Sequence, residues 1–483
     1  MRTTNKYFVT VCLTVLLGGG LGAAQGEVPV TTSSREALQL YTRAQEKAEN
    51  LETEAAAGLL EQAIAKDPAF AMAYLLRSQS GGGFAITREN LEKAASLADK
   101  VSAGEKDQIL AAKAQADGDA TAAKQHLDRL LAAYPSDKRV QSLLGFHYRG
   151  VLGDNKTAAT YFKKATEIDP AFAAAYNNLG YAQSATGDYA GAEATFKKYI
   201  SLLPDRANPY DSYAELLMKM GRYDDSIVQY KAALARDGAF IGSLAGIGTD
   251  LVFKKDYAGG RTWYQQQLAK STDLNAKLDA MENIAISYVH EGQTVQALKA
   301  LDEIAELAGK GGLPTRAIGA HTDAAFILLE AGQAVQAEPY VTKASAVAGT
   351  SSLPASVKER LGIVSSLLHA RVLSMQGKLP EANAVVASTS EIVARRASPL
   401  EQHRLNEVQG ILALGQKQYA HAVELLSKAD QDSPYVIYQQ ALAAEGAGRT
   451  GEASALFKKV AQWNVNDLGY ATVRARAMAK TTN

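Results

Sequence analysis

The sequence AAAYNNLGYAQSATGDYAGAEATFKKYISLLPDR, residues 173–206, has the pattern of two amphipathic helices joined by one tight turn. In each helix, the residues at i, i+3, i+4 and i+7 share one face, so each helix has one stripe to bury. Gly187 permits the left-handed backbone that ends a helix, and Asp188 can cap the next helix by accepting hydrogen bonds from its free N–H groups. Pro204 prevents the second helix from continuing. The stretch therefore predicts one helical hairpin.

A hairpin of this kind recurs along the chain, and the residue at which its two helices cross is small in eleven copies; the copy that starts at Ala71 is interrupted by Gly81-Gly82-Gly83. Counted from the start of each unit, position twenty is occupied by Ala56, Ala123, Ala158, Ala192, Ser226, Gly260, Ala297, Ala337, Ala382, Ala422 and Ala453. Position eight is equally small, at Ala44, Ala111, Gly180, Ala214, Gly248, Ala285, Ala325, Ala370, Gly410 and Ala441. Because bulky side chains would hold the helices apart, the pattern predicts an all-α chain of about eleven or twelve hairpins.

The repeated unit resembles the tetratricopeptide repeat, whose pattern runs aromatic, Leu-Gly, Ala, aromatic, Ala and Pro at these spacings. The unit that starts at Arg139 departs from the pattern, because its Leu144-Gly145 pair comes one residue early. The resemblance is strong in the first half of the chain and at the end, and moderate between. It implies a superhelical solenoid of antiparallel hairpins, of an exported bacterial type, that binds other proteins.

The repeat period and the connections predict five segments along the chain. After about residue 275 the period lengthens to around 40, and the connections become richer in proline, as in Gly311-Gly312-Leu313-Pro314. We expect a signal peptide over 1–24, a flexible lead over 25–36, regular repeats over 37–274, longer and divergent hairpins over 275–402, and regular repeats with a capping helix over 403–483. A solenoid needs such a cap because its last apolar face would otherwise meet water.

The first residues have the order of an export signal. Arg2 and Lys6 precede an apolar run over 7–17, and a small-residue site ends at Ala24. We therefore expect cleavage after Ala24 and export to the periplasm or the extracellular space. The alternative is a protein anchored in the membrane by an uncleaved segment. The only cysteine, Cys12, lies in this run, so the mature chain would have no disulfide.

Charge and motif content argue against several classes of function. Lys plus Arg and Asp plus Glu both number 51, so no net charge favours nucleic acid. The seven histidines are not spaced three or four apart on one helix, and no nucleophile motif or phosphate-binding loop occurs. The sequence predicts no enzyme, no metal, no small-molecule cofactor and no nucleic-acid partner.

A candidate binding surface follows from helical geometry. Positions two, five, nine, twelve and thirteen of a first helix share the stripe opposite the hairpin core. In the repeat family that stripe lines a groove. In three regular units these positions give Asn177, Tyr181, Ser184, Asn208, Asp211, Glu215, Met218, Lys219, Thr249, Val252 and Phe253. Asp211 and Glu215, beside Tyr181 and Phe253, suit a segment with a basic residue flanked by apolar ones.

Two functions remain open at this point. The first is a non-catalytic scaffold that holds a protein or peptide segment in the groove. The second is an accessory subunit of a cell-envelope assembly, secretion or glycan-machinery complex, which would associate with a membrane complex. The residues do not name the partner.

Overall fold

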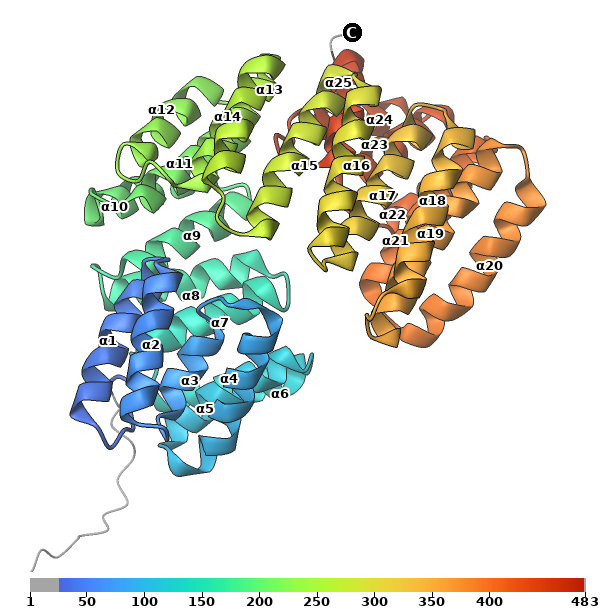
Figure 1. Ribbon diagram of the computed structural model, residues 1–483. Helices are drawn as coiled ribbons and strands as arrows, with labels where there is room; N and C mark the ends of the chain where they lie inside the picture. Colours follow the sequence, from blue (N-terminus) through green and yellow to red (C-terminus); the bar gives the residue numbers. More distant parts are fainter. Residues whose placement is uncertain (1–25, 482–483) are drawn as a thin grey trace, which may run out of the picture. The chain divides into compact units, whose positions relative to one another are not determined.

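The computed structural model of the protein describes residues 26–481 and builds this part of the chain from α-helices and one short 3₁₀ helix, without a strand (Figure 1). The all-α solenoid predicted from the repeats is confirmed. The predicted signal peptide, residues 1–24, lies outside the described residues. The chain divides into two compact units, with the boundary between Asp188 and Tyr189.

Unit 1 contains four helical hairpins and one further helix. Its helices are α1 (Arg35–Glu49), α2 (Thr53–Lys66), α3 (Ala71–Ser78), α4 (Gly83–Leu97), η1 (Ala98–Lys100), α5 (Ala103–Ala116), α6 (Ala120–Ala133), α7 (Lys138–Gly150), α8 (Asn155–Ile168) and α9 (Ala173–Ala185). The pairs α1/α2, α3/α4, α5/α6 and α7/α8 pack as hairpins, and α9 packs on α8.

Unit 2 contains seven hairpins, from α11/α12 to α23/α24, with one helix before them and one after. Its helices are α10 (Tyr189–Leu202), α11 (Ala207–Lys219), α12 (Tyr223–Leu234), α13 (Ile241–Phe253), α14 (Tyr257–Lys270), α15 (Leu274–Glu291), α16 (Thr294–Lys310), α17 (Pro314–Glu330), α18 (Ala334–Thr350), α19 (Ala355–Met375), α20 (Leu379–Arg396), α21 (Pro399–Gly415), α22 (Tyr419–Ser427), α23 (Pro434–Gly446), α24 (Thr450–Ala461) and α25 (Leu468–Thr481). Helices α15 to α21 are longer than α10 to α14. Helix α25 packs on α23 and α24 and also reaches α15 and α17.

The turn inside a hairpin is built from a left-handed residue followed by a cap. Gly118 and Gly153 have φ values of 81° and 68°. The next residues, Asp119 and Asp154, each accept a hydrogen bond from a main-chain N–H three residues on, at 2.9 Å. Glycine adopts positive φ without strain, and the carboxylate satisfies a donor that the new helix leaves free. Short polar turns thus fix the antiparallel pairing.

Close helix crossing is the basis of the packing. All eleven residues at position twenty are buried, as predicted from their small size. A Cβ added to Gly145 would lie 2.5 Å from Phe162 Cε1, and one added to Gly248 would lie 2.5 Å from Tyr264 Cε1. Each ring is fully buried. The second helix therefore lays an aromatic ring directly on the backbone of the first.

Replacing Gly145 by Ala should lower stability, because its methyl group has no room beside the Phe162 ring; we expect an overpacking cost of about 1 to 3 kcal/mol. Gly58→Ala is the matched control. No atom lies within 4 Å of its added Cβ, and helix propensity favours alanine by about 1 kcal/mol. Thermal unfolding followed by circular dichroism compares the two. A rise in Tm for both variants would contradict the close crossing.

Candidate functional site

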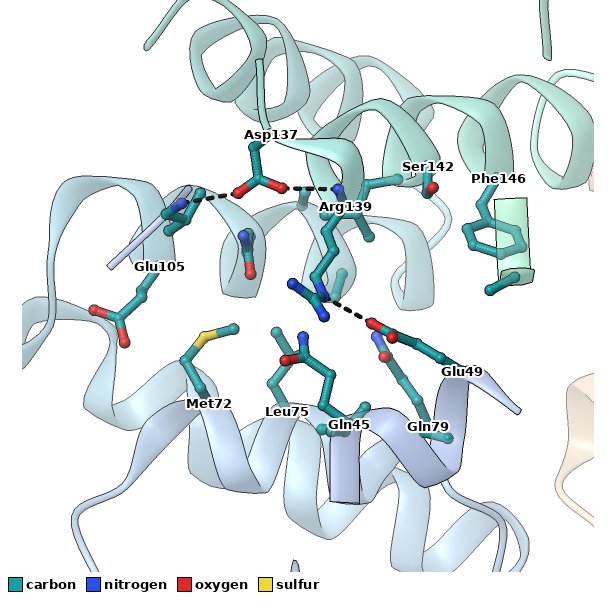
Figure 2. Close-up of a pocket in the computed structure, with 18 of the residues that line it drawn as sticks. Gln45, Glu49, Met72, Leu75, Gln79, Glu105, Asp137, Arg139, Ser142 and Phe146 are labelled. Atoms are coloured by element: carbon teal, nitrogen blue, oxygen red, sulfur yellow. Dashed lines mark hydrogen bonds and ion pairs between the residues drawn. The ribbon is translucent and has the colours of Figure 1, made fainter. Parts of the chain in front are cut away.

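The first helix of each hairpin in unit 1, together with α9, surrounds a cavity of about 480 Å³ (Figure 2). We call this surface, formed by α1, α3, α5, α7 and α9 around the cavity, the unit 1 groove. Met72 and Leu75 of α3 and Phe146 of α7 give it apolar lining on two sides, and Phe146 is 48% exposed. Side-chain amides, each both donor and acceptor, line much of the rest: Gln45, Gln79, Gln108, Gln115, Asn177 and Asn178.

One ion pair spans the groove. Arg139, on α7, is the only basic residue among those that line the cavity, and its Nε donates to Glu49 Oε1 of α1 at 2.7 Å. Figure 2 shows the guanidinium in the middle of the site, above the α1 and α3 side chains. A second carboxylate, that of Glu27, lies 3.8 Å from Arg139 Nη1. Arg139 thus offers a positive centre in a site that is otherwise neutral or acidic.

An extended N-terminal segment, residues 27–33, lies along one wall of the groove; we call it the strap. The Val28 N–H donates to Asp137 Oδ2 at 2.8 Å, and the Thr31 N–H donates to Glu105 Oε1 at 2.7 Å. The Ser33 N–H donates to Asp67 Oδ2, also at 2.8 Å. The sequence predicts a flexible lead here, whereas three main-chain donors are bound to carboxylates. Those carboxylates come from distant parts of the sequence, which is why a local pattern gave no sign of the contact.

Hydroxyl groups of the strap reinforce the main-chain contacts. Thr31 Oγ1 donates to Glu105 Oε2 at 2.5 Å, and Thr32 Oγ1 donates to Asp67 Oδ2 at 2.6 Å. The Thr32 hydroxyl bond is the main reason that the pKa of Asp67 falls below its usual value. Asp67 is therefore ionised at neutral pH, and an anionic acceptor makes the stronger kind of hydrogen bond.

The three carboxylates are held in place by helix ends. Asp137 caps α7 by accepting from the Arg139 N–H at 2.7 Å, and Asp67 accepts from the Ala69 N–H at 3.0 Å. Glu105 closes a capping box at the start of α5, where the Ser102 N–H donates to its Oε2 at 2.9 Å. Asp137 and Glu105 each accept from an N–H at a helix start, Asp67 accepts from an N–H in the turn between α2 and α3, and all three also accept from the strap. Their positions therefore do not depend on the strap.

Of the predicted residues in unit 1, only Asn177 lines the cavity. Its side chain is 8% exposed, and within the described part of the chain its Oδ1 has no hydrogen-bond partner. Tyr181 packs instead under the Arg149 guanidinium, 5.4 Å from the ring centre. Ser184 is buried on α9. The predicted stripe thus contributes one residue to the unit 1 groove.

In unit 2, several predicted residues are engaged between hairpins. Asn208 Nδ2 donates to the Tyr199 hydroxyl at 3.1 Å, and Asp211 Oδ1 accepts from Ser243 Oγ at 2.6 Å. Thr249 shares a 3.0 Å hydrogen bond with the Tyr264 hydroxyl. Burial, followed by the charge of the partly exposed Glu215, raises the pKa of Asp211 to about 7. The expectation that this stripe faces outward is corrected here, because neighbouring hairpins cover Asp211.

The C-terminal segment covers the remaining predicted residues of unit 2. Val252 and Phe253 are 0% and 3% exposed, and Arg474 of α25 donates from Nη2 to the Phe253 carbonyl at 3.2 Å. Met218 packs against the same apolar core, and the Lys219 carbonyl accepts from Asn464 Nδ2 at 3.3 Å. Residues that were expected to line an open groove therefore contact the C-terminal segment, through Asn464 and Arg474. Their role in binding a partner stays a prediction.

The rule that selected those residues also finds the unit 1 groove, when it is applied to earlier repeats. Positions two, five, nine, twelve and thirteen of the units starting at 37, 71 and 104 include eleven lining residues: Tyr41, Gln45, Ala48, Glu49, Met72, Leu75, Gln79, Glu105, Gln108, Ala112 and Gln115. The sequence signal was thus present in the first three repeats. The strap and the ion pair across the groove have no such signal.

Comparison with known proteins agrees with this architecture. Residues 152–216 match the family model of the tetratricopeptide repeat. Solved structures with a similar fold include MamA (24% identity, 33% of this chain and 94% of MamA covered, TM-score 0.30). PilW, described as a widely conserved type IV pilus biogenesis factor, is 16% identical, with 52% of this chain and 100% of PilW covered and a TM-score of 0.32. A tetratricopeptide repeat protein from Parabacteroides merdae is 16% identical, with 53% of this chain and 93% of that protein covered and a TM-score of 0.36.

The stacked hairpins and the family match define an α-helical repeat protein of the interaction-scaffold class. Within this chain, residues 152–216 match the tetratricopeptide repeat, and the fold is an all-α solenoid of helical hairpins. A fold of this family implies a protein or peptide partner.

The described residues offer neither a metal site nor a membrane-spanning helix. They contain no group of three or more His, Cys, Asp or Glu side chains placed to hold a metal ion. No helix among them is both long and apolar enough to span a membrane.

Asp211 should make stability depend on pH. Its folded pKa of about 7 lies above the unfolded value of 3.8, so the folded state binds the proton more tightly and loses stability as pH rises between these values. Asp211→Asn keeps an acceptor for Ser243 and cannot ionise. Its advantage in Tm over the natural protein should grow as the pH rises from about 4 to about 7. An advantage that does not change with pH would contradict the raised pKa.

Proposed function

We propose that this protein is a non-catalytic scaffold that binds an extended segment of a partner protein in the unit 1 groove. One observation carries the proposal: an extended segment of the chain itself, the strap, lies on this surface with three main-chain N–H groups bound to carboxylates. Main-chain hydrogen bonds give affinity for extended polypeptide, and neighbouring pockets give specificity. The groove offers both kinds of contact.

The cavity beside the strap suits an apolar side chain of the partner. Its volume of about 480 Å³ lies within the range of ligand pockets, which are mostly apolar with a few placed polar groups. The buried Oδ1 of Asn177, without a hydrogen-bond partner in the described residues, supplies one such group. Leaving a buried acceptor unpaired costs about 1 to 3 kcal/mol, so a donor from a ligand would be favoured there.

The chemistry of the groove supports binding and not catalysis. Its carboxylates Glu105 and Asp137 are committed to helix ends and to the strap, and Glu49 is paired with Arg139. No nucleophile, base and orienting group converge among the lining residues. We therefore propose that the groove binds its partner without catalysing a reaction on it.

A photoreactive amino acid placed at Gln79 tests the binding site, because this side chain is exposed and lines the cavity. The same residue at Val335, which is 73% exposed on α18, is the matched control. We expect crosslinks from position 79 to map to one extended stretch of a partner, and Phe146→Ala to weaken them severalfold by removing an exposed apolar ring from the cavity lining. Equal crosslinking from both positions would contradict a site in the groove.

We also propose that the protein is exported with loss of residues 1–24, as the charged start, apolar run and small-residue site suggest. Cleavage after Ala24 would leave Gln25 as the first residue, two positions before the strap. Intact-mass measurement of the natively expressed protein decides this point. A soluble cytoplasmic product that still begins at Met1 would rule out cleavage.

A further inference from the structure

We propose that the strap is a ligand held in cis and that the partner of the unit 1 groove is an extended segment of the same chemistry, which binds by displacing it. This inference rests on the proposed function and adds the class of partner. The strap sequence is Glu27-Val28-Pro29-Val30-Thr31-Thr32-Ser33. The partner segment would carry an acidic residue first, then short apolar residues, and then hydroxyl residues.

The order of chemical groups follows from the contacts. At one end, Arg139 faces the Glu27 carboxylate and selects an acid. At the other end, Glu105 and Asp67 accept from the Thr31 and Thr32 hydroxyls and from main-chain N–H groups. A carboxylate at those later positions would meet like charges with no donor to offer, which is strongly unfavourable in a partly buried site. The groove therefore distinguishes the direction of a segment as well as its charge.

The acceptor sites persist when the strap leaves. Glu105 and Asp137 each accept from an N–H at the start of their helix, and Asp67 accepts from the Ala69 N–H in the turn before α3. Acceptors that are already positioned need no further ordering when a ligand arrives, so a second segment can use them at low entropic cost. In this respect the site is preorganised for any chain with the same donors.

The strap itself is held loosely enough to be displaced. Most of its residues are exposed, Val30 by 36%, and its contacts are hydrogen bonds more than apolar burial. Ordering seven residues loses conformational entropy, which offsets much of what those bonds contribute. The strap also covers part of the cavity, since Val28, Pro29 and Val30 are among the lining residues. Its departure would open the cavity toward the three carboxylates.

The test uses the full chain carrying Thr31→Pro. Proline removes the main-chain N–H and the hydroxyl that Thr31 donates to Glu105, and it leaves every groove residue unchanged. The probe is a fluorescein-labelled peptide with the sequence of residues 26–34, GEVPVTTSS, and binding is followed by fluorescence anisotropy. We expect the variant to bind the probe at least about ten-fold more tightly than the natural protein does, because the competing strap is weakened.

The matched control is Val335→Ala, which shortens a side chain that is 73% exposed on α18 and leaves the strap and its three N–H donors unchanged; it should bind the probe as the natural protein does. A probe peptide that itself carries Thr31→Glu should not bind the Thr31→Pro chain. If thermal unfolding shows that this chain does not fold, Val28→Pro, which removes the donor to Asp137, takes its place.

A strap variant that folds and binds the probe no more tightly than the natural protein overturns the inference. The photocrosslinking from position 79 is independent of this result. Partner crosslinks at position 79 without probe binding would leave the groove as the binding site and show that the strap is not its model ligand. Absence of both would remove the proposed function as well.

Discussion

Close crossing of the two helices in each hairpin is the constraint on which the rest of the structure depends. An aromatic ring from the second helix rests on the backbone of the first, as Phe162 does at Gly145 and Tyr264 does at Gly248. Any larger residue at the crossing would have to push the helices apart. The crossing therefore fixes the rotation of each first helix about its axis. Once that rotation is fixed, the same positions in successive repeats must lie on the same surface.

That surface acquires its chemistry from residues that also complete the helices. Asp137 and Glu105 satisfy main-chain donors at the starts of α7 and α5, as capping residues do in many helices. Their remaining acceptor sites face the strap. Capping explains why carboxylates occur at these positions, and the turn of the chain between hairpins brings them near one another. A local requirement of helix formation thus provides the acceptors of a binding surface.

The two units use their corresponding stripes differently. In unit 1 the stripe lines a cavity with Arg139 across it and the strap along one side. In unit 2 the corresponding residue Phe253 is covered by the C-terminal helix α25, and Arg474 lies 4.7 Å above its ring. The repeat that starts at residue 241 in unit 2 has the same length as the regular repeats of unit 1. A segment outside the repeats covers the stripe in each unit: the strap in unit 1 and α25 in unit 2.

The sequence by itself determined the helical hairpins, their crossing residues and the positions that lie opposite each hairpin core. These features are local: they depend on residues three or four apart and on turns of a few residues, so periodicity reveals them. The sequence also places lining residues of the unit 1 groove, such as Gln45 and Gln79, at the repeat positions opposite the hairpin core. Only the tertiary structure decided which part of the stripe is open. The Val28 contact with Asp137 joins residues 109 apart, and the Asn464 contact with Lys219 joins residues 245 apart. Contacts at such separations depend on how the stacked repeats curve and where the chain ends return, and no local pattern records that geometry.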